Sequence, residues 1–327
     1  MYNLITIGDP VIDTHIQIDN SSGNLEELKG TKHLCFEYGA KIPIIDSFQA
    51  LGGNAANVAV GTQKLGMKTA LVSTVGNDST GKVAFDELKK YGVDTTYVST
   101  DPKAKTRYSV ILNYKADRTI LSYSDKKNYE WPEPFPETEW IYYTGLSEGY
   151  EKLQSKLVSY LKKHPSVRLA LNPGSFMLKH NVDDIKEMIE RTDVLIVNVQ
   201  EAERLLGTTI KKEKNVEALI HELVGMGVKE VAITDGGNGA WAGDANEAWH
   251  LDAYPVHVVA KTGAGDAFSA GYLAARQYGH DLQHALEWGI ANSCSVVSEH
   301  GPHKGLLDKK EVMAVIQKFP THQPQEL

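Results

Sequence analysis

The stretch KTGAGDAFSAGYLAA, residues 261–275, places a carboxylate, Asp266, where a glycine turn runs into a helix of small residues. Glycines before a helix expose successive backbone N–H groups at the positive end of the helix dipole, and such an end binds anions. Two interpretations of Asp266 compete. It caps the helix, or it takes a proton from an alcohol that attacks a phosphate held by the turn. A cap explains Asp266 but leaves Gly263 and Gly265 unexplained.

Segments typical of strands and helices alternate on both sides of this stretch. Apolar runs typical of buried strands, such as YNLITIGD at 2–9 and VLIVN at 194–198, are separated by amphipathic or small-residue segments. This alternation predicts an α/β fold, a three-layer α/β/α sandwich in which helices cover both faces of a mainly parallel central sheet. We expect further strands at 68–76, 139–145, 167–174 and 228–236, and helices at 54–66, 82–92, 149–163, 182–191, 199–206, 214–225, 264–278 and 281–299.

Two segments interrupt this alternation. Residues 14–50 have strand signals without a helix, and KAKTRYSVILNYKADRTILSY at 104–124 is typical of an antiparallel hairpin that turns near Ala116. We therefore expect a single domain over residues 1–327, with a small β-sheet lid from about 14–50 and 98–128 inserted in it. Beside a parallel sheet, such a lid covers a site or forms a dimer surface.

Composition and charge exclude several classes of protein. The chain has 34 Lys and Arg residues against 42 Asp and Glu residues, a net charge of −8, so we expect no nucleic-acid partner. Two cysteines, Cys35 and Cys294, cannot form a disulfide framework or a four-thiolate zinc site. The N-terminus begins with a strand-like run rather than a signal peptide, and no apolar stretch reaches the ~20 residues that span a bilayer. We therefore expect a cytoplasmic protein without a membrane partner.

Other motifs in the sequence are incomplete. GNDSTGKV at 76–83 approaches a phosphate-binding P-loop, but Val83 stands where a hydroxyl should bind magnesium, so we expect a surface turn before a helix. GAGDAF at 263–268 has Phe268 where a dinucleotide fingerprint needs its third glycine. The sequence lacks HExxH, paired CxxC and Gly-x-Ser-x-Gly motifs, which disfavours a zinc enzyme and an esterase.

A second glycine-rich stretch, LGGNAANVAVG at 51–61, indicates binding of hydroxyl groups. Gly52 and Gly53 allow a ligand close to the backbone, and Asn54 and Asn57 face the same way one helical turn apart. Amide side chains both donate and accept hydrogen bonds, which suits the hydroxyls of a sugar. Taken alone, however, a capped helix explains these residues better.

Asp13 lies just beyond the first predicted strand. We expect an exposed carboxylate there, able to accept hydrogen bonds from two hydroxyl groups. By itself, such a residue is equally well explained as part of a turn.

Together these motifs resemble the paired signatures of the ribokinase-like (PfkB) carbohydrate kinases. LGGNAANVAVGTQKLG and KTGAGDAFSAGYLAA are similar to the N-terminal and C-terminal signatures. Intermediate landmarks follow in the family's order, with LNPG at 171–174, VNVQEAERLLG at 197–207 and ITDGGNGAW at 233–241. The resemblance covers nearly the whole chain. It implies a ribokinase-like fold and transfer of the γ-phosphate of ATP to a hydroxymethyl group of a sugar or nucleoside.

The resemblance also implies roles for residues at the two signatures. Asp266 matches the catalytic base, and the backbone from Gly263 through Ala264 to Gly265 matches the anion hole. A residue of the lid hairpin, Arg107 or Tyr108, is expected to reach the substrate unless it occupies a solvated edge. The family's acceptor contacts match Asp13, Gly52, Gly53, Asn54 and Asn57.

The implied cofactors are ATP and Mg²⁺. Asn198 and Glu201 match an NxxE pattern that orders water around magnesium, although a strand end followed by a helix-starting acid explains them about as well. The nucleotide contacts match Asn198, Thr234, Gly236, Gly239 and Asn292.

The chain departs from the family pattern at two places. Many relatives have Asp-Thr-Thr before Gly-Ala-Gly-Asp, where the first Asp helps to bind a monovalent cation, whereas this chain has Ala260, Lys261 and Thr262. Potassium activation is therefore doubtful, and we hypothesise that Lys261 supplies the positive charge instead. Ribokinases proper often carry Lys where Asn54 stands, which weakens an assignment to ribose.

Several acceptors and roles stay open at this point. A nucleoside kinase of the same family needs an apolar or aromatic slot, and a kinase for phosphorylated sugars needs extra cations such as Lys41, Lys105 and Arg107. A non-catalytic sugar-binding regulator would have lost Asp266 or the glycines, and both are present. The resemblance also implies a homodimer through the lid sheet. The aromatic candidates for a nucleoside slot are Phe36, Tyr38, Phe48, Tyr108 and Tyr123.

Overall fold

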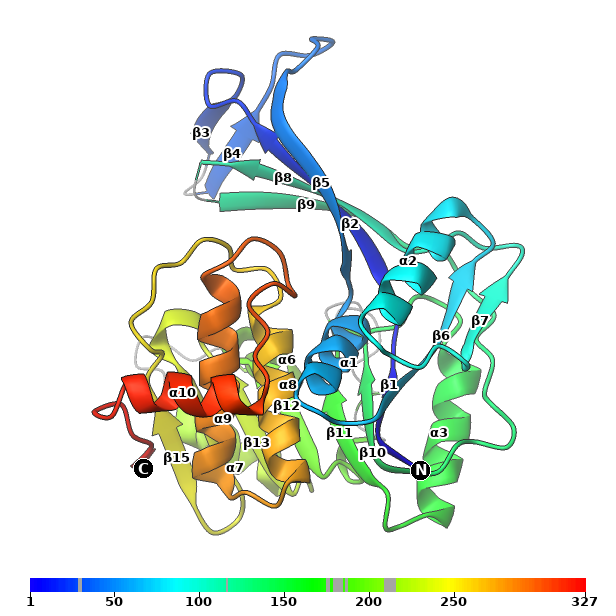
Figure 1. Ribbon diagram of the computed structural model, residues 1–327, viewed down its shortest axis with the longest axis vertical. Helices are drawn as coiled ribbons and strands as arrows, with labels where there is room; N and C mark the ends of the chain where they lie inside the picture. The colour runs from blue at the N-terminus through cyan, green and yellow to red at the C-terminus, as the bar shows by residue number, and fades with distance from the viewer. Residues whose placement is uncertain (29–30, 116, 175–176, 179–184, 186–187, 209–215) are drawn as a thin grey trace.

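A long twisted sheet forms the centre of the molecule (Figure 1). The computed structural model describes residues 1–327 except 29–30, 116, 175–176, 179–184, 186–187 and 209–215. Within the described residues, ten strands join in the order β16-β15-β14-β13-β12-β11-β10-β1-β6-β7. Neighbours from β7 to β13 are parallel, and neighbours from β13 to β16 are antiparallel. The strands are Tyr2–Ile7 (β1), Thr69–Gly76 (β6), Val98–Asp101 (β7), Thr138–Thr144 (β10), Arg168–Asn172 (β11), Val194–Asn198 (β12), Glu230–Thr234 (β13), Ala240–Gly243 (β14), Ala248–Leu251 (β15) and Gln325–Glu326 (β16).

Helices cover both faces of this sheet. Alternate strand residues point to opposite faces, so Ile5 and Tyr143 pack with α3, α6 and α7, whereas Leu4 and Tyr142 pack with α1, α8 and α9. This arrangement confirms the predicted three-layer α/β/α fold with a mainly parallel sheet. The helices are Asn54–Lys64 (α1), Ser79–Lys90 (α2), Glu151–Lys163 (α3), Val199–Leu206 (α6), Val216–Gly225 (α7), Ala264–Gln277 (α8), Leu282–Val297 (α9) and Lys309–Lys318 (α10).

A separate small sheet stands beyond the carboxyl ends of the parallel strands (Figure 1). Four strands pair in the order β5-β2-β8-β9, and β3 and β4 form a two-stranded ribbon. β2 follows directly on β1, and β5 leads directly into α1, so the small sheet joins the main body at the N-terminus of α1. The strands are Val11–Ile18 (β2), Asn24–Leu28 (β3), Thr31–Cys35 (β4), Ile44–Gly52 (β5), Tyr108–Tyr114 (β8) and Asp117–Tyr123 (β9).

Most of the predicted elements lie within two or three residues of those in the structure. Half of the helix expected over 182–191 lies outside the described residues, and so does Ala116 of the expected hairpin turn. The surface turn expected at 76–83 is shorter than predicted, because α2 already begins at Ser79. The Asp78 side chain accepts a hydrogen bond from the Gly81 N–H and caps this helix. Among the described residues, no helix has the length and apolarity that a membrane crossing requires.

Candidate active site

Asp266 is the third residue of α8, at the carboxyl edge of the sheet. Gly263 is the residue that precedes the helix, and its φ of 81° is a left-handed conformation that favours glycine. A methyl group there would lie 2.5 Å from the Cβ of Pro302, whereas the space around Gly265 is open within 4 Å. No side chain of the described residues caps this helix. The first N–H groups of α8 therefore remain for another acceptor, as an anion site requires.

Close helix packing explains the small residues that follow Asp266. A methyl on Gly271 would lie 2.4 Å from the carbonyl oxygen of Trp288 in α9. A methyl on Gly61 of α1 would lie 2.6 Å from the Cβ of Ala270. The small-residue run therefore lets α8 lie directly between α1 and α9, which fixes Asp266 against the start of α1.

The Asp266 carboxylate meets a residue from the N-terminal signature. The Nδ2 of Asn57 donates to Oδ2 of Asp266 at 2.7 Å. Burial raises the pKa of Asp266 to about 6, with smaller upward contributions from the Glu201 and Asp13 charges, while the Asn57 hydrogen bond lowers it. A carboxylate with a pKa near the working pH suits a general base. The bond to α1 and the absence of a capping bond favour the base interpretation over the helix cap.

The two glycines before α1 bring the backbone against the Asp13 carboxylate and the backbone of Asp9. A methyl on Gly52 would lie 2.2 Å from Oδ2 of Asp13. Gly53 has a φ of 90°, and a methyl there would lie 2.3 Å from the carbonyl oxygen of Asp9. Their lack of a side chain is therefore a packing requirement, which places Asp13 at the entrance of α1.

The position of Asp13 corrects the sequence expectation. It is not an exposed turn residue, because the chain resumes a strand at Val11 and Asp13 lies inside β2, only 9% exposed. Burial raises the pKa of Asp13, opposed by a hydrogen bond from Ser109 and by the charge of Arg107. Arg107 is half-buried, and its Nε is a buried atom without a partner among the described residues. Arg107 therefore does not occupy a solvated edge.

Asn54 is held by Asn172, the asparagine of the LNPG landmark. Its Nδ2 donates to Oδ1 of Asn172 at 3.0 Å, at the carboxyl end of β11. Asn172 also accepts from Thr144 Oγ1 at 3.1 Å and donates to the carbonyl oxygen of Ile196 at 2.7 Å. Asn172 therefore holds the Asn54 side chain in one orientation.

Asn198 and Glu201 form a reciprocal cap at the start of α6. The Glu201 N–H donates to Oδ1 of Asn198 at 2.9 Å, and the Asn198 N–H donates to Oε2 of Glu201 at 3.0 Å. Burial raises the pKa of Glu201. Among the described residues, no group of three or more His, Cys, Asp or Glu side chains could hold a metal ion. The two reciprocal bonds make the pair a capping box, which is the structural explanation that the sequence left open.

The turn after β13 lies beside this cap. Thr234 pairs with Asn198 across β12 and β13, at the same edge of the sheet. Gly236 and Gly239 have φ values of 55° and 85°, and a methyl on Gly239 would lie 2.0 Å from the carbonyl oxygen of Leu251. Both glycines therefore serve the turn itself.

Asn292 does not face an open site. It is 0% exposed; its Nδ2 donates to the carbonyl oxygen of Ala267 at 2.7 Å, and its Oδ1 accepts from the Leu307 N–H at 3.0 Å. The side chain joins α8 and α9 to the segment before α10. The nucleotide contact implied for Asn292 thus has no support in this conformation.

The aromatic candidates on the small sheet lie on different faces. Strand register places Phe48 beside His15 and on the same face as Asp13, whereas Tyr108 and Tyr123 lie on the opposite face. The rings of Phe48 and His15 stack at 4.5 Å between centroids and 5° between planes. Phe36 and Tyr38 follow β4, outside the four-stranded sheet. Only Phe48 of the five therefore shares the face of Asp13 within that sheet.

Two histidines that belong to none of the sequence motifs also lie in this region. His303 lies in the loop after α9, and its Nε2 is 2.8 Å from Oδ1 of Asn57. His15 is 6% exposed, and its Nε2 has no partner among the described residues. Both are single histidines in segments without a recognisable pattern, so only the three-dimensional arrangement connects them to Asp13 and Asp266.

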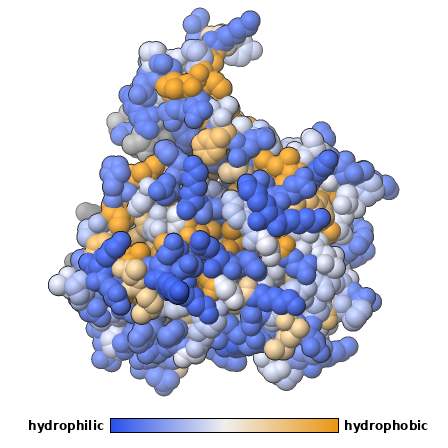
Figure 2. Space-filling view, in the orientation of Figure 1, coloured by the Kyte–Doolittle hydropathy of each residue, from blue (hydrophilic) through white to orange (hydrophobic). Residues whose placement is uncertain are grey.

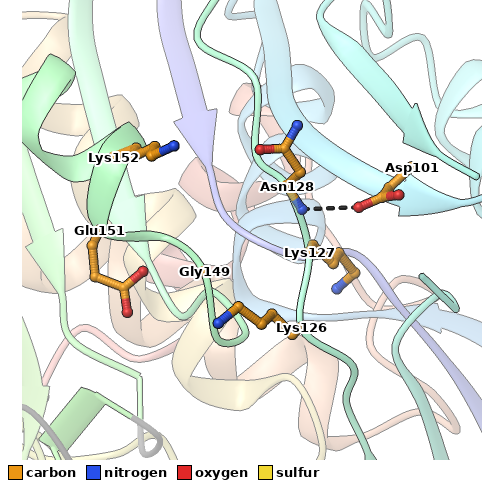
Figure 3. Close-up of a pocket in the computed structure, with 7 residues that line it drawn as sticks. All are labelled: Asp101, Lys126, Lys127, Asn128, Gly149, Glu151 and Lys152. Atoms are coloured by element: carbon orange, nitrogen blue, oxygen red, sulfur yellow. Dashed lines mark hydrogen bonds between the residues drawn. The ribbon is translucent and has the colours of Figure 1, made fainter. Parts of the chain in front are cut away.

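A cavity of about 460 Å³ lies between the segment that follows β9 and the start of α3 (Figure 3). Lys127 belongs both to its lining and to a buried ion pair, in which Nζ donates to Oδ2 of Asp9 at 3.0 Å. This ion pair links the segment that follows β9 to the residues just after β1. No residue assigned to the site from the sequence lines the cavity. Its lining residues are Asp101, Lys126, Lys127, Asn128, Gly149, Glu151 and Lys152.

The sequence of the chain matches a family model over most of its length. Residues 46–309 match the pfkB family of carbohydrate kinases. The chain belongs to this family. The predicted family, fold class and carbohydrate kinase activity are thereby confirmed.

Curated relatives of this pfkB-family kinase have several acceptors in their names. It is 24% identical to a ribokinase of Staphylococcus aureus, with 81% of this chain and 87% of the relative covered. It is 27% identical to a 5-dehydro-2-deoxygluconokinase of Bacillus subtilis, with 82% and 86% covered.

Solved structures share the fold. An Arabidopsis thaliana ribokinase complexed with ribose and ATP has a TM-score of 0.77 at 21% identity, with 97% of this chain and 99% of that chain covered. A Burkholderia thailandensis nucleoside kinase in complex with inosine has a TM-score of 0.76 at 17% identity, with 98% and 100% covered. At these identities, the likeness concerns the fold alone.

Proposed function

We propose that this kinase transfers the γ-phosphate of ATP to a hydroxymethyl group of a sugar, with Asp266 as the base. The observation that carries the proposal is the position of Asp266, a carboxylate with a raised pKa beside the uncapped N-terminus of α8. The acceptor oxygen forms a bond to the γ-phosphorus as the bond to the β-bridging oxygen breaks. The hydroxyl proton passes to the Asp266 carboxylate, and ADP leaves.

The first N–H groups of α8 are proposed to stabilise the transferring phosphoryl group. Its charge spreads over three oxygens in the transition state, and fixed N–H groups of residues 263–265 provide donors without reorganisation. The open space around Gly265 supports this assignment, because a phosphate must approach the backbone closely there. A low-dielectric site beneath the small sheet would strengthen the interaction further.

The acceptor is proposed to lie between Asp13, Asn54 and Asn57. Asp13 accepts hydrogen bonds from hydroxyls, and the two amides both donate and accept. Asp13 belongs to the small sheet and Asn54 to the main body, so both parts contribute to the acceptor site. Movement of the small sheet as a lid would then exclude water during transfer.

We favour a sugar over a nucleoside as the acceptor. The buried Nε of Arg107 and Nε2 of His15 both lack partners among the described residues, which suits a ligand rich in oxygen. A nucleoside needs a flat apolar slot, yet one side of Phe48 is already covered by His15. A carboxylate or phosphate on the sugar would pair favourably with Arg107.

The nucleotide is proposed to lie along the edge formed by Asn198, Thr234, Gly236 and Gly239. Mg²⁺ would bind mainly through phosphates and water and neutralise the phosphate charge. A carboxylate oxygen of Glu201 is suited to order that water, since Oε2 already accepts from the backbone and fixes its orientation.

A homodimer through the small sheet is part of the proposal. The sheet exposes several large apolar side chains, and it projects as a separate lobe from the main body (Figure 2). Light scattering should therefore give twice the chain mass, and Ile45→Lys should give the monomer mass. Met313→Lys, a comparably exposed change on α10, should leave the dimer intact. The exposed apolar residues of this sheet are Ile44, Ile45, Phe48, Ile120, Leu121 and Tyr123.

A panel of acceptors tests the proposed function. ADP release from ATP and magnesium would be measured with neutral sugars, sugar acids, sugar phosphates and nucleosides, and the product identified by phosphorus NMR. We expect one class of sugar to give rapid turnover. Turnover on nucleosides alone would show that the acceptor is a nucleoside and not a sugar. Binding of a sugar without turnover on any acceptor would contradict a catalytic role.

A further inference from the structure

A chain of three side chains connects the loop between α9 and α10 to Asp266. His303 lies after α9, Asn57 on α1 and Asp266 on α8. The two contacts measure 2.8 Å from His303 Nε2 to Asn57 Oδ1 and 2.7 Å from Asn57 Nδ2 to Asp266 Oδ2. Asn57 itself is only 6% exposed, so water competes little for these bonds.

The atoms in this chain fix the direction of each hydrogen bond. An ionised carboxylate only accepts, so the Asn57 atom facing Asp266 must be the amide nitrogen. The amide oxygen then faces His303, and the ring nitrogen there must carry a proton. Burial, with a smaller contribution from the Lys90 charge, lowers the pKa of His303 to about 4. His303 is therefore neutral at physiological pH and carries its proton on Nε2.

We propose that His303 is a positioning residue, which holds the Asn57 amide in the orientation that donates to Asp266. Without the ring, the Asn57 amide gains freedom to flip or rotate away, and the carboxylate loses its donor. That donor favours the ionised form of Asp266 and opposes the effect of burial. The description of Asp266 as a base rests on the proposed function, whereas the three-residue chain is a property of the fold.

Other charged groups around the chain are few among the described residues. Asp266 interacts with Glu201 on α6 and Asp13 on β2, both of which raise its pKa. Burial raises the pKa of Tyr142 on β10, and the Asp266 charge raises it further. His303 interacts with the Lys90 charge and packs against the Tyr91 ring at 4.9 Å between centroids. None of these groups replaces the donor that Asn57 provides to Asp266.

The test is a carbon-NMR titration of the full chain labelled at Asp carboxyl carbons. The Asp266 signal is identified by its loss in Asp266→Asn. We expect a wild-type midpoint near pH 6. His303→Ala should raise the midpoint by about one pH unit, as expected for loss of one hydrogen bond to a part-buried carboxylate. His303→Gln, which keeps an N–H donor, should titrate like wild type, and so should Tyr91→Leu, which removes only the ring contact.

An unchanged midpoint in folded His303→Ala would overturn the proposal. A second measurement needs no variant. In the wild type, a long-range proton–nitrogen spectrum of the His303 ring should give the neutral form protonated on Nε2, and the form protonated only on Nδ1 would also overturn it. Neither readout depends on turnover, so failure of the proposed function and failure of this inference are distinguishable.

Discussion

Asn57 Nδ2 lies 2.7 Å from Asp266 Oδ2, although the two residues are 209 positions apart. The contact joins the two glycine-rich signatures of the pfkB family at one carboxylate. Burial raises the pKa of Asp266, and the hydrogen bond from the Asn57 amide opposes this shift.

The pH dependence of turnover should follow the ionisation of Asp266. Its folded pKa is raised to about 6, so the active carboxylate form is lost as the pH falls through that value. Below it, kcat should fall about tenfold per pH unit, because only the ionised base accepts a proton. A full pH profile at saturating substrates provides the measurement. An acid limb at or below pH 4 would indicate that Asp266 has an ordinary pKa.

Asn57 and Asn54 lie on the same face of α1 and should differ in their effects. Asn57→Ala should move the acid limb of kcat to higher pH, because Asp266 loses its hydrogen-bond donor. Asn54→Ala should raise KM for the acceptor without moving the limb, since Asn54 is bound to Asn172 and not to Asp266. Steady-state kinetics across pH separate the two. Identical profiles for the two variants would contradict the assignment.

Gly52→Ala should weaken acceptor binding. The new methyl would lie 2.2 Å from Oδ2 of Asp13, so the carboxylate must move away from the acceptor. We expect KM for the acceptor to rise about tenfold or more, which corresponds to loss of one good hydrogen bond. Gly225→Ala is the matched control, because a methyl there meets nothing within 4 Å. It should retain wild-type KM, and an unchanged KM in Gly52→Ala would remove Asp13 from the site.

Potassium should have little effect on the wild-type enzyme. Lys261 is exposed beside the start of α8, where its ammonium group is expected to supply the charge that a monovalent cation provides in many relatives. Lys261→Ala should therefore lose activity or become dependent on potassium. Assays in sodium and potassium salts at equal ionic strength test this. Strong potassium activation of the wild type would reject the hypothesis.

The sequence predicted those features that depend on local patterns. Strand and helix alternation predicted the three layers, and the glycines around Asp266 predicted a turn with exposed N–H groups at a helix start. Asp13 was misjudged because its burial depends on pairing with β5 and with β8, and β8 begins some ninety residues later in the chain. A single sequence does not reveal which strands become neighbours.

The environment of Asn57 could not be predicted for a similar reason. Helical spacing indicated the face of α1 that it occupies, but its partners come from α8 and from the loop after α9. Asn292 illustrates the converse, because its helix was predicted correctly while its side chain points into the interior. Periodicity identifies an element, whereas the packing of whole layers decides which polar groups meet.

The most direct test of Asp266 as the base is the turnover of Asp266→Asn with the accepted sugar. Calorimetry would first establish that the variant still binds sugar and nucleotide, since asparagine can still accept from Asn57. We expect kcat to fall by about a thousandfold with binding retained, which is the size typical of removing a general base. Turnover at the wild-type rate would contradict the account and leave Asp266 with a structural role only.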